Sequence, residues 1–399
     1  SGVNNNTIQN PLHGSIMGLP YSEAGIYNTG QELVDAIGTN FAGSNDTYVL
    51  ADILREGSLP SYFTESNLLA SAFANYKITK DITLGNKFGV DYKQNDGVFA
   101  RAPQSYLAIV VKNIRGEEFG GFEDMSTVKD FTFTNIMNLN YSKVYKDVHT
   151  LDAGVYFEYV KSHRKTKFQS QNGLNPLTYV PGAGTGYVAF NPANPNSFLP
   201  EVSASEINAG TLSYFATLDY DYNERFGFSG VVRRDATYRF VDDKKWGTFW
   251  SASGRWNIDK ESFMEGSAFN MLKLRASIGT QGNQNIIASA SGVNPLFTAN
   301  DIVRDLIGSG NGYNNQQGVF VSQIANTTLQ WEEINQTNVG IDFEVLNSRL
   351  RGNVDVYDKS TSRLFSSDNT WAATSLFSQV ANNGEISNRG IELSLKYKL

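Results

Sequence analysis

Residues 211–222 read TLSYFATLDYDY, and this stretch decides the fold class. Every second position carries an apolar or aromatic side chain: Leu212, Tyr214, Ala216, Leu218, Tyr220 and Tyr222. The positions between them are polar apart from Phe215: Thr211, Ser213, Thr217, Asp219 and Asp221. A period of two is that of a β-strand, whereas a helix would spread the charged residues around its axis. The stretch therefore predicts a strand with one oily face and one wet face.

The same alternation recurs along the chain. It occupies the segments 67–78, 82–93, 131–142, 148–161, 226–236, 246–257, 271–279, 338–345, 350–360 and 391–399. With the first stretch these make about eleven strands, each near the length that crosses a bilayer at the tilt of a barrel strand. The sequence therefore predicts an all-β protein, a transmembrane antiparallel β-barrel.

The connections between these strands alternate in length. Short turns at 79–81, 223–225 and 347–349 alternate with long polar segments at 94–130, 162–210, 282–335 and 362–387. Membrane barrels have short periplasmic turns and long extracellular loops, whereas a soluble sandwich has short loops at both ends. We also expect residues 1–66 to be mostly loop, and the link 258–270 to be a periplasmic turn longer than the others.

Composition agrees with a membrane barrel and excludes several other classes. Of the 399 residues 40% are apolar and 13% aromatic, and the formal net charge is −7. No window approaches the roughly 18 apolar residues of a spanning helix, but a barrel strand shows lipid only alternate residues. The acidic balance disfavours nucleic acid as a partner, because phosphate binding needs clustered Lys and Arg. The absence of cysteine excludes disulfides and thiolate chemistry.

The strand count indicates a partial barrel. About eleven antiparallel strands cannot close, and open edges inside lipid leave costly unpaired backbone groups. No signal peptide opens the chain, which starts SGVNNN. We therefore expect residues 1–399 to be part of a larger barrel.

Six segments in the second half of the chain resemble one family. They are YFATLDYDYNERFGFSGVVRRDATYRF (214–240), WGTFW (246–250) with GRWNI (254–258), LKLRASIGTQGNQNI (272–286), LQWEEINQTNVGIDFEVLNSRL (329–350), VDVYDKSTSRLF (354–365) and NGEISNRGIEL (383–393). Their order and spacing are similar to those of the barrel in the SusC/RagA family of TonB-dependent transporters. After the Arg-Arg-Asp of residues 233–235, the sequence ATYRF departs from the family's usual Gly-Ser-Ser-Arg-Phe.

The resemblance implies a plugged barrel of about 22 strands in the bacterial outer membrane. Such transporters import glycan oligosaccharides or peptides, work with a SusD-like surface lipoprotein that lids the barrel, and draw energy from a TonB complex acting on the plug. The implied surroundings are the lipid bilayer and lipopolysaccharide. The resemblance therefore leads us to expect the plug and the terminal strands to lie outside residues 1–399.

The sequence predicts no catalytic residue, metal site or cofactor. The three histidines, His13, His149 and His163, have no metal-ligand spacing. The glycine-rich runs 182–186 and 308–312 lack the following helix that a phosphate cradle needs. Carboxylates recur on almost every polar strand face, which indicates a hydrated lumen rather than a catalytic pair.

Aromatic side chains in the long loops are the candidate substrate contacts, because ring faces stack on sugars or grip peptide side chains. The candidates are Tyr179, Tyr187, Phe190, Phe297, Tyr313, Phe320 and Trp371. Packing of these loops against a plug or partner is the alternative for any one of them. Two other functions stay open at this stage, a surface glycan-binding β protein and an outer-membrane β-barrel enzyme.

Overall fold

The computed structural model describes residues 29–37, 52, 55–192, 198–285, 295–297, 302–311, 316–369 and 378–399. Its strands are β1 (Ser61–Lys77), β2 (Ile82–Arg101), β3 (Gly120–Tyr145), β4 (His149–Leu174), β5 (Glu201–Tyr222), β6 (Phe226–Thr237), β7 (Trp246–Asn257), β8 (Phe269–Asn283), β9 (Leu306–Asn311), β10 (Gln317–Gln323), β11 (Glu332–Val345), β12 (Leu350–Asn369) and β13 (Ser378–Tyr397). Its helices are α2 (Gly30–Ile37) and α4 (Tyr106–Arg115), with short 3₁₀ turns elsewhere. None of the helices in these ranges is long and apolar enough to span a membrane.

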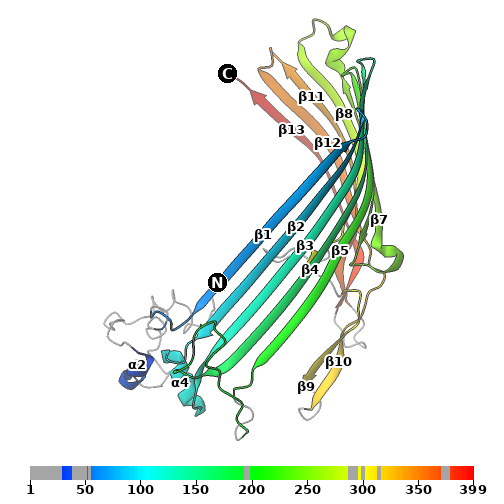
Figure 1. Cartoon of the computed structure of the whole chain (residues 1–399). Helices are drawn as coiled ribbons and strands as arrows, with labels where there is room; N and C mark the ends of the chain where they lie inside the picture. Colours follow the sequence, from blue (N-terminus) through cyan, green and yellow to red (C-terminus); the bar gives the residue numbers. More distant parts are fainter. Residues whose placement is uncertain are drawn as a thin grey trace. The chain divides into compact units, whose positions relative to one another are not determined.

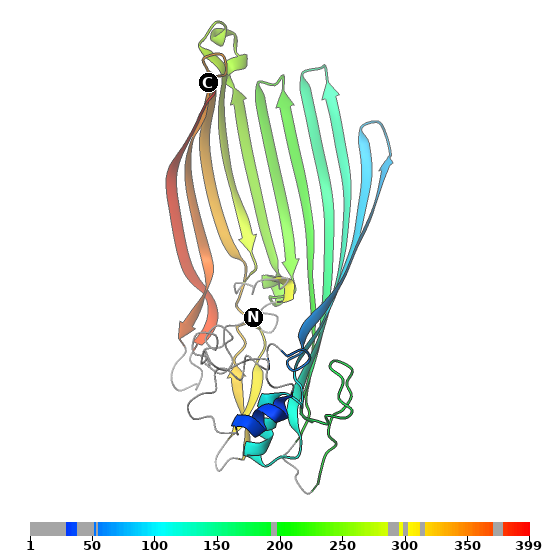
Figure 2. The same ribbon diagram turned by 90° about the vertical axis from the view of Figure 1, so that its left-hand side faces the viewer.

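Eleven of the strands form one sheet (Figures 1 and 2). Their order is β1-β2-β3-β4-β5-β6-β7-β8-β11-β12-β13, so each strand lies beside its neighbour in the sequence except where the separate β9–β10 hairpin intervenes. From β5 onward each pair of neighbouring strands in this sheet is antiparallel. The predicted count of about eleven strands and their antiparallel pairing agree with this sheet.

The predicted loops were too long, because the strands continue into them. β3 and β4 have 26 residues each, whereas the predicted segments had about a dozen. Helix α4 and the β9–β10 hairpin also lie within segments predicted as loop, 94–130 and 282–335. The physical reason is that alternation marks only the lipid band: beyond it both strand faces meet water, so a strand can continue without a period-two pattern.

The first 66 residues were predicted to be mostly loop, and the structure describes only parts of them. Helix α2 and the start of β1 at Ser61 correct the prediction for the described part, while residues 1–28, 38–51, 53 and 54 lie outside it. The predicted short turns are present. Asn223, Glu224, Asn347 and Ser348 all have positive φ, between 50° and 61°, which suits tight hairpins.

Burial across the sheet is the reverse of that in a soluble protein. Residues opposite each other in the register lie on the same face, and one such row joins Leu274, Ile341, Val354 and Leu393. Ile341 is 44% exposed and Leu393 63%, whereas Asp355 on the other face is 7% exposed. Soluble proteins bury the apolar face. The oily face is therefore open to contact lipid, as predicted.

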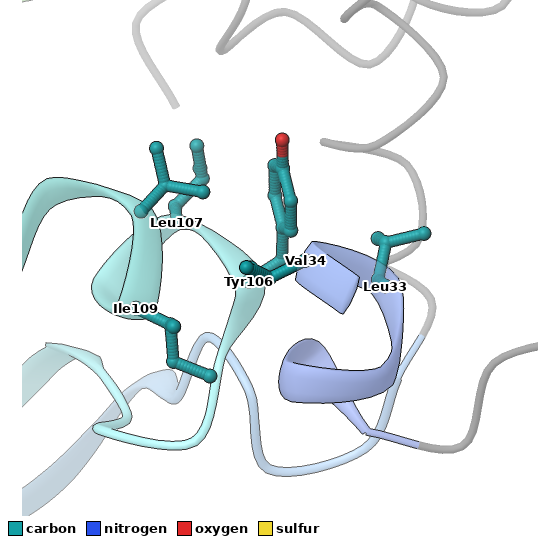
Figure 3. Packing of buried hydrophobic residues seen from close by; sticks show 6 residues of the cluster. Leu33, Val34, Tyr106, Leu107 and Ile109 are labelled. Atoms are coloured by element: carbon teal, nitrogen blue, oxygen red, sulfur yellow. The ribbon is translucent and has the colours of Figure 1, made fainter. Parts of the chain in front are cut away.

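The chain divides into two compact units. The first comprises residues 1–68, 92–131 and 164–206, and the second comprises 69–91, 132–163 and 207–399. In the first, α2 packs on α4 through a small apolar core (Figure 3) of Leu33, Val34, Tyr106, Leu107, Ile109 and Val110. The helices approach closely because α2 begins at Gly30, where a Cβ would lie 2.4 Å from the backbone nitrogen of Tyr106.

The apolar core of the second unit gathers residues from four of the motif segments. Its buried members are Phe240, Phe249, Leu329 and Trp331, with Ile302, Val303, Phe365 and Val380 packed against them. Phe249 lies over Gly247 and Gly282, where added Cβ atoms would be 2.5 and 2.0 Å from its ring. The motif residues Phe240, Phe249, Trp331 and Phe365 are thus a single packing unit.

Candidate functional site

A row of charged residues crosses the polar face of the second unit. The register places six residues opposite one another on six adjacent strands: Asp221, Gly227, Arg255, Arg275, Gly340 and Asp355. We call this set the arginine row. Its order, Asp-Gly-Arg-Arg-Gly-Asp, is a palindrome with the two arginines at the centre.

Each arginine of the row reaches across a glycine to an aspartate two strands away. Arg275 Nη2 donates to Asp355 Oδ2 at 2.7 Å, and its Nε lies 3.2 Å from both carboxylate oxygens of Asp342. Strands are about 4.8 Å apart, so the guanidinium must lie over the residue between them. That residue is Gly340, where a Cβ would be 2.5 Å from Asp355 Oδ1 and 2.8 Å from Arg275 Cζ.

The other half of the arginine row repeats this geometry. Arg255 donates to Asp221 across Gly227, and a Cβ at Gly227 would lie 2.8 Å from Arg255 Cζ. The two adjacent arginines are thereby each paired with a carboxylate rather than left to repel each other. Sequence reasoning missed the row. The only signal in the sequence was a glycine among the polar-face positions of a strand. Its meaning depends on the strand register, which is set by pairing between segments far apart in the sequence.

The Arg-Arg-Asp motif of residues 233–235 takes part in an ion-pair network. Arg233 Nε lies 2.7 and 2.9 Å from the two oxygens of Asp235, and its Nη2 reaches Ser213 at 2.9 Å and Glu158 at 3.2 Å. Its guanidinium also lies 4.8 Å from the ring centre of Phe215. This explains why one aromatic residue occupies the polar face of the deciding stretch.

The long turn after β7 is held by a second ion pair. Glu261 accepts from Arg225 Nη2 at 2.5 Å and from the indole Nε1 of Trp256 at 3.0 Å. The hydrogen bond from Arg225 lowers the pKa of Glu261, and that from Trp256 adds to the shift. The link 258–270 is longer than the other turns, as predicted, and its Glu261 joins the β7–β8 hairpin to the β5–β6 hairpin.

In the first unit a buried carboxylate organises the loop of residues 175–187. Glu123 has no exposed surface, and its oxygens accept from the hydroxyls of Tyr179 at 2.9 Å and Tyr187 at 2.7 Å and from the backbone N–H of Gly182 at 2.8 Å. We call these four residues the Glu123 hub. Burial, and then the bond to Glu123, raises the pKa of both tyrosines well above 10.

A cavity of about 630 Å³ lies beside α4, between the end of β2 and the start of β3. We call it the α4 cavity. Its charged lining residues are Arg101, Lys112, Arg115 and Glu117, and its rings are Phe99, Phe119 and Phe122. Its volume falls within the range of about 300–1,000 Å³ typical of small-molecule sites.

Helix α4 is fixed in place by side chains from far away in the sequence. The carboxylate of Asp52, which is fully buried, accepts from the backbone N–H groups of Tyr106 at 2.8 Å and Leu107 at 2.9 Å. Burial raises the pKa of Asp52. At the other side Gly120 permits close contact, since a Cβ there would lie 2.4 Å from the carbonyl oxygen of Ala108. The wall of the α4 cavity is therefore preorganised.

The structure describes five of the seven loop aromatics predicted as substrate contacts, and their surroundings differ. Tyr179 and Tyr187 meet at the Glu123 hub. Phe190 is 59% exposed, Phe320 on β10 is 56% exposed, and Phe297 is 4% exposed. Tyr313 and Trp371 lie outside the described residues. Substrate contact by any of the seven stays a prediction.

The described histidines have ordinary partners. His149 Nδ1 lies 2.7 Å from the hydroxyl of Tyr220, and His163 contacts Asn208. His13 lies outside the described residues. Across the described ranges, no group of three or more His, Asp or Glu side chains is arranged to hold a metal ion.

Comparison with known proteins identifies the family of the chain. The profile of the family described as "TonB dependent receptor-like, beta-barrel" matches residues 18–399. TonB-dependent receptor P39 of Formosa agariphila is 28% identical over 342 residues, which are 84% of this chain and 30% of that protein. TonB-dependent receptor SusC of Bacteroides thetaiotaomicron is 27% identical over 343 residues, 84% of this chain and 32% of that protein.

Solved structures show the same fold. The RagAB peptide transporter aligns with a TM-score of 0.71 and 23% identity over 90% of this chain and 37% of the matched chain. The chain spans about a third of the length of the relatives it matches. The resemblance to the SusC/RagA group is confirmed. The chain belongs to the TonB dependent receptor-like β-barrel family, whose members are outer-membrane β-barrel proteins.

Proposed function

We propose that the chain forms part of the barrel wall of a TonB-dependent importer of oligomeric nutrients, either glycans or peptides. The observation that carries the proposal is the reversed burial of the sheet. Val339 and Ile341 are 45% and 44% exposed on the oily face, while Asp235 and Asp355 are 9% and 7% exposed on the wet face. A wall of this kind suits a lipid exterior and an aqueous interior.

The wet face supports passage rather than catalysis. Arg255 and Arg275 of the arginine row are paired with carboxylates, so they add hydrogen-bonding groups to this face without adding unpaired positive charge. The relatives it matches are named receptors and transporters. We therefore propose transport and not an enzymatic reaction. By the same likeness, a TonB complex acting on a plug would supply the energy, and a SusD-like lipoprotein would cover the outer mouth.

Uptake in the bacterium that encodes the chain tests this function. A strain lacking the full-length gene should lose uptake of one class of labelled oligomer, and a strain lacking TonB should lose the same class. Uptake that persists without TonB, or loss of no oligomer class at all, would contradict the proposal. A lipoprotein that co-purifies with the full-length protein in detergent would support the lid.

Exposed loop aromatics test the substrate contacts. We expect Phe320→Ala and Phe190→Ala to raise the apparent KM for uptake while the protein level in the outer membrane stays unchanged. Leu177→Ala is the matched control, because Leu177 is 91% exposed in another loop position and is not aromatic. An equal effect of all three substitutions would show that the rings have no special role.

A further inference from the structure

We propose that the α4 cavity binds the C-terminal residue of a peptide, with Arg101 holding the terminal carboxylate and the phenylalanine wall holding an apolar side chain. The inference rests on the proposed import function and names its ligand class. It is carried by a buried guanidinium N–H without a hydrogen-bond partner, by the charge of the lining and by the near absence of neutral polar side chains there.

Arg101 presents an unused hydrogen-bond donor. Its Nε is buried and has no hydrogen-bond partner in the described part of the chain. Its Cζ lies over the ring of Phe122, 5.4 Å from the ring centre, so the ring covers one face of the guanidinium and the unpartnered Nε–H lies on the edge. That edge matches a carboxylate in a bidentate pair, which is the geometry that arginine favours.

The charge of the lining favours an anion. Lys112 and Arg115 join Arg101 in the wall, against the single carboxylate of Glu117. Within the described residues, neither Lys112 nor Arg115 forms an ion pair. The nearby carboxylate of Asp52 is occupied by two backbone N–H groups of α4. A positive, partly enclosed surface of this kind attracts a negatively charged group.

The rest of the lining suits a peptide better than a sugar. Phe99, Phe119 and Val111 line the cavity together with the buried Leu107. Among the described lining residues, Asn172 is the only one with a neutral polar side chain. An acidic sugar carries hydroxyls around its ring, and each one buried without a hydrogen-bond partner would be costly. A C-terminal residue with an apolar side chain buries no such hydroxyls, and its carboxylate can pair with Arg101.

Binding of paired peptides to the purified full-length protein tests the proposal. The probes are short peptides ending in phenylalanine or leucine, each with a free carboxylate and with a C-terminal amide, measured by calorimetry in detergent. We expect the free acid to bind at least about tenfold more tightly than the amide, since a charge-assisted hydrogen bond is lost. Arg101→Gln should remove this preference, so that acid and amide then bind with similar affinity. Lys165→Gln is the control, because Lys165 is an exposed cation of the same unit paired with Glu206.

Equal binding of acid and amide, or an unchanged preference in Arg101→Gln, would overturn the proposal. Tighter binding of a uronic-acid oligosaccharide than of the acid peptide would assign the cavity to acidic glycans instead and overturn it too. Folding of each variant is checked by the mobility of the unheated barrel on a detergent gel. Binding without uptake would contradict only the import function, whereas uptake without the carboxylate preference would contradict only this inference.

Discussion

Gly340 is predicted to be essential to one ion pair of the arginine row, and Gly340→Ala tests this. The new methyl group would lie 2.5 Å from Asp355 Oδ1 and 2.8 Å from Arg275 Cζ, closer than nonbonded atoms approach. Both contacts are to the ends of flexible side chains, so the backbone can stay and the ion pair must move. The expected result is displacement of Arg275 from Asp355 without loss of the sheet.

The magnitude follows from the exposure of the pair. A hydrogen bond between charged groups contributes about 1.5–3 kcal/mol, and we take the lower end because the Arg275 side chain is 36% exposed. Replacing a strand glycine by alanine returns about 0.5–1 kcal/mol. Gly340→Ala should therefore destabilise the protein by about 1 kcal/mol net. In an Arg275→Ala background it should instead be neutral or stabilising, because the Asp355 carboxylate, no longer held by Arg275, can turn away from the new methyl group.

The assay is urea unfolding of the full-length protein in lipid vesicles, with the folded fraction followed by gel mobility. The four proteins of the double-mutant cycle should show a coupling of about 1.5 kcal/mol between Gly340 and Arg275. Gly254→Ala is the matched control, because a Cβ there meets its nearest atom only at 3.9 Å. Additive effects of Gly340→Ala and Arg275→Ala would refute the reasoning.

Three further outcomes are expected. Ala252→Lys on the oily face of β7 should cost about 2–4 kcal/mol in a membrane, whereas Ser253→Lys beside it, flanked by serines on the wet face, should cost little in the same urea assay. Glu261→Gln should lower the urea midpoint at neutral pH. Arg225 lowers the folded-state pKa of Glu261, so its contribution is present above the ordinary value of 4.5 and is lost as the pH falls through the lowered pKa, where variant and wild type should converge. Glu123→Ala should free the loop of the Glu123 hub, seen as faster hydrogen exchange there with unchanged exchange in β11, and equal protection in both proteins would contradict the role of the hub.

The strands of the membrane wall could be predicted from the period-two pattern of the sequence. The alternation in residues 211–222 and its repeats predicted the eleven strands of the sheet and their lipid face, because contact with lipid is decided residue by residue along one strand. The short turns were equally local, as the left-handed residues Asn223 and Glu224 illustrate. The closest partner of Arg233, Asp235, lies two positions away in the sequence, so this ion pair is local as well.

The side-chain contacts between strands, and the packing around α4 and the loop of residues 175–187, could be learned only from the tertiary structure. Arg275 meets Asp355 because the register places Gly340 between them, and register is a property of pairing between distant segments. The parts of β3 and β4 that extend beyond the lipid have water on both faces, so their sequences show no period-two alternation. Beside the α4 cavity, Asp52 holds the start of α4. In the Glu123 hub, Glu123 of β3 holds the loop of residues 175–187. No pattern along a single strand encodes either contact.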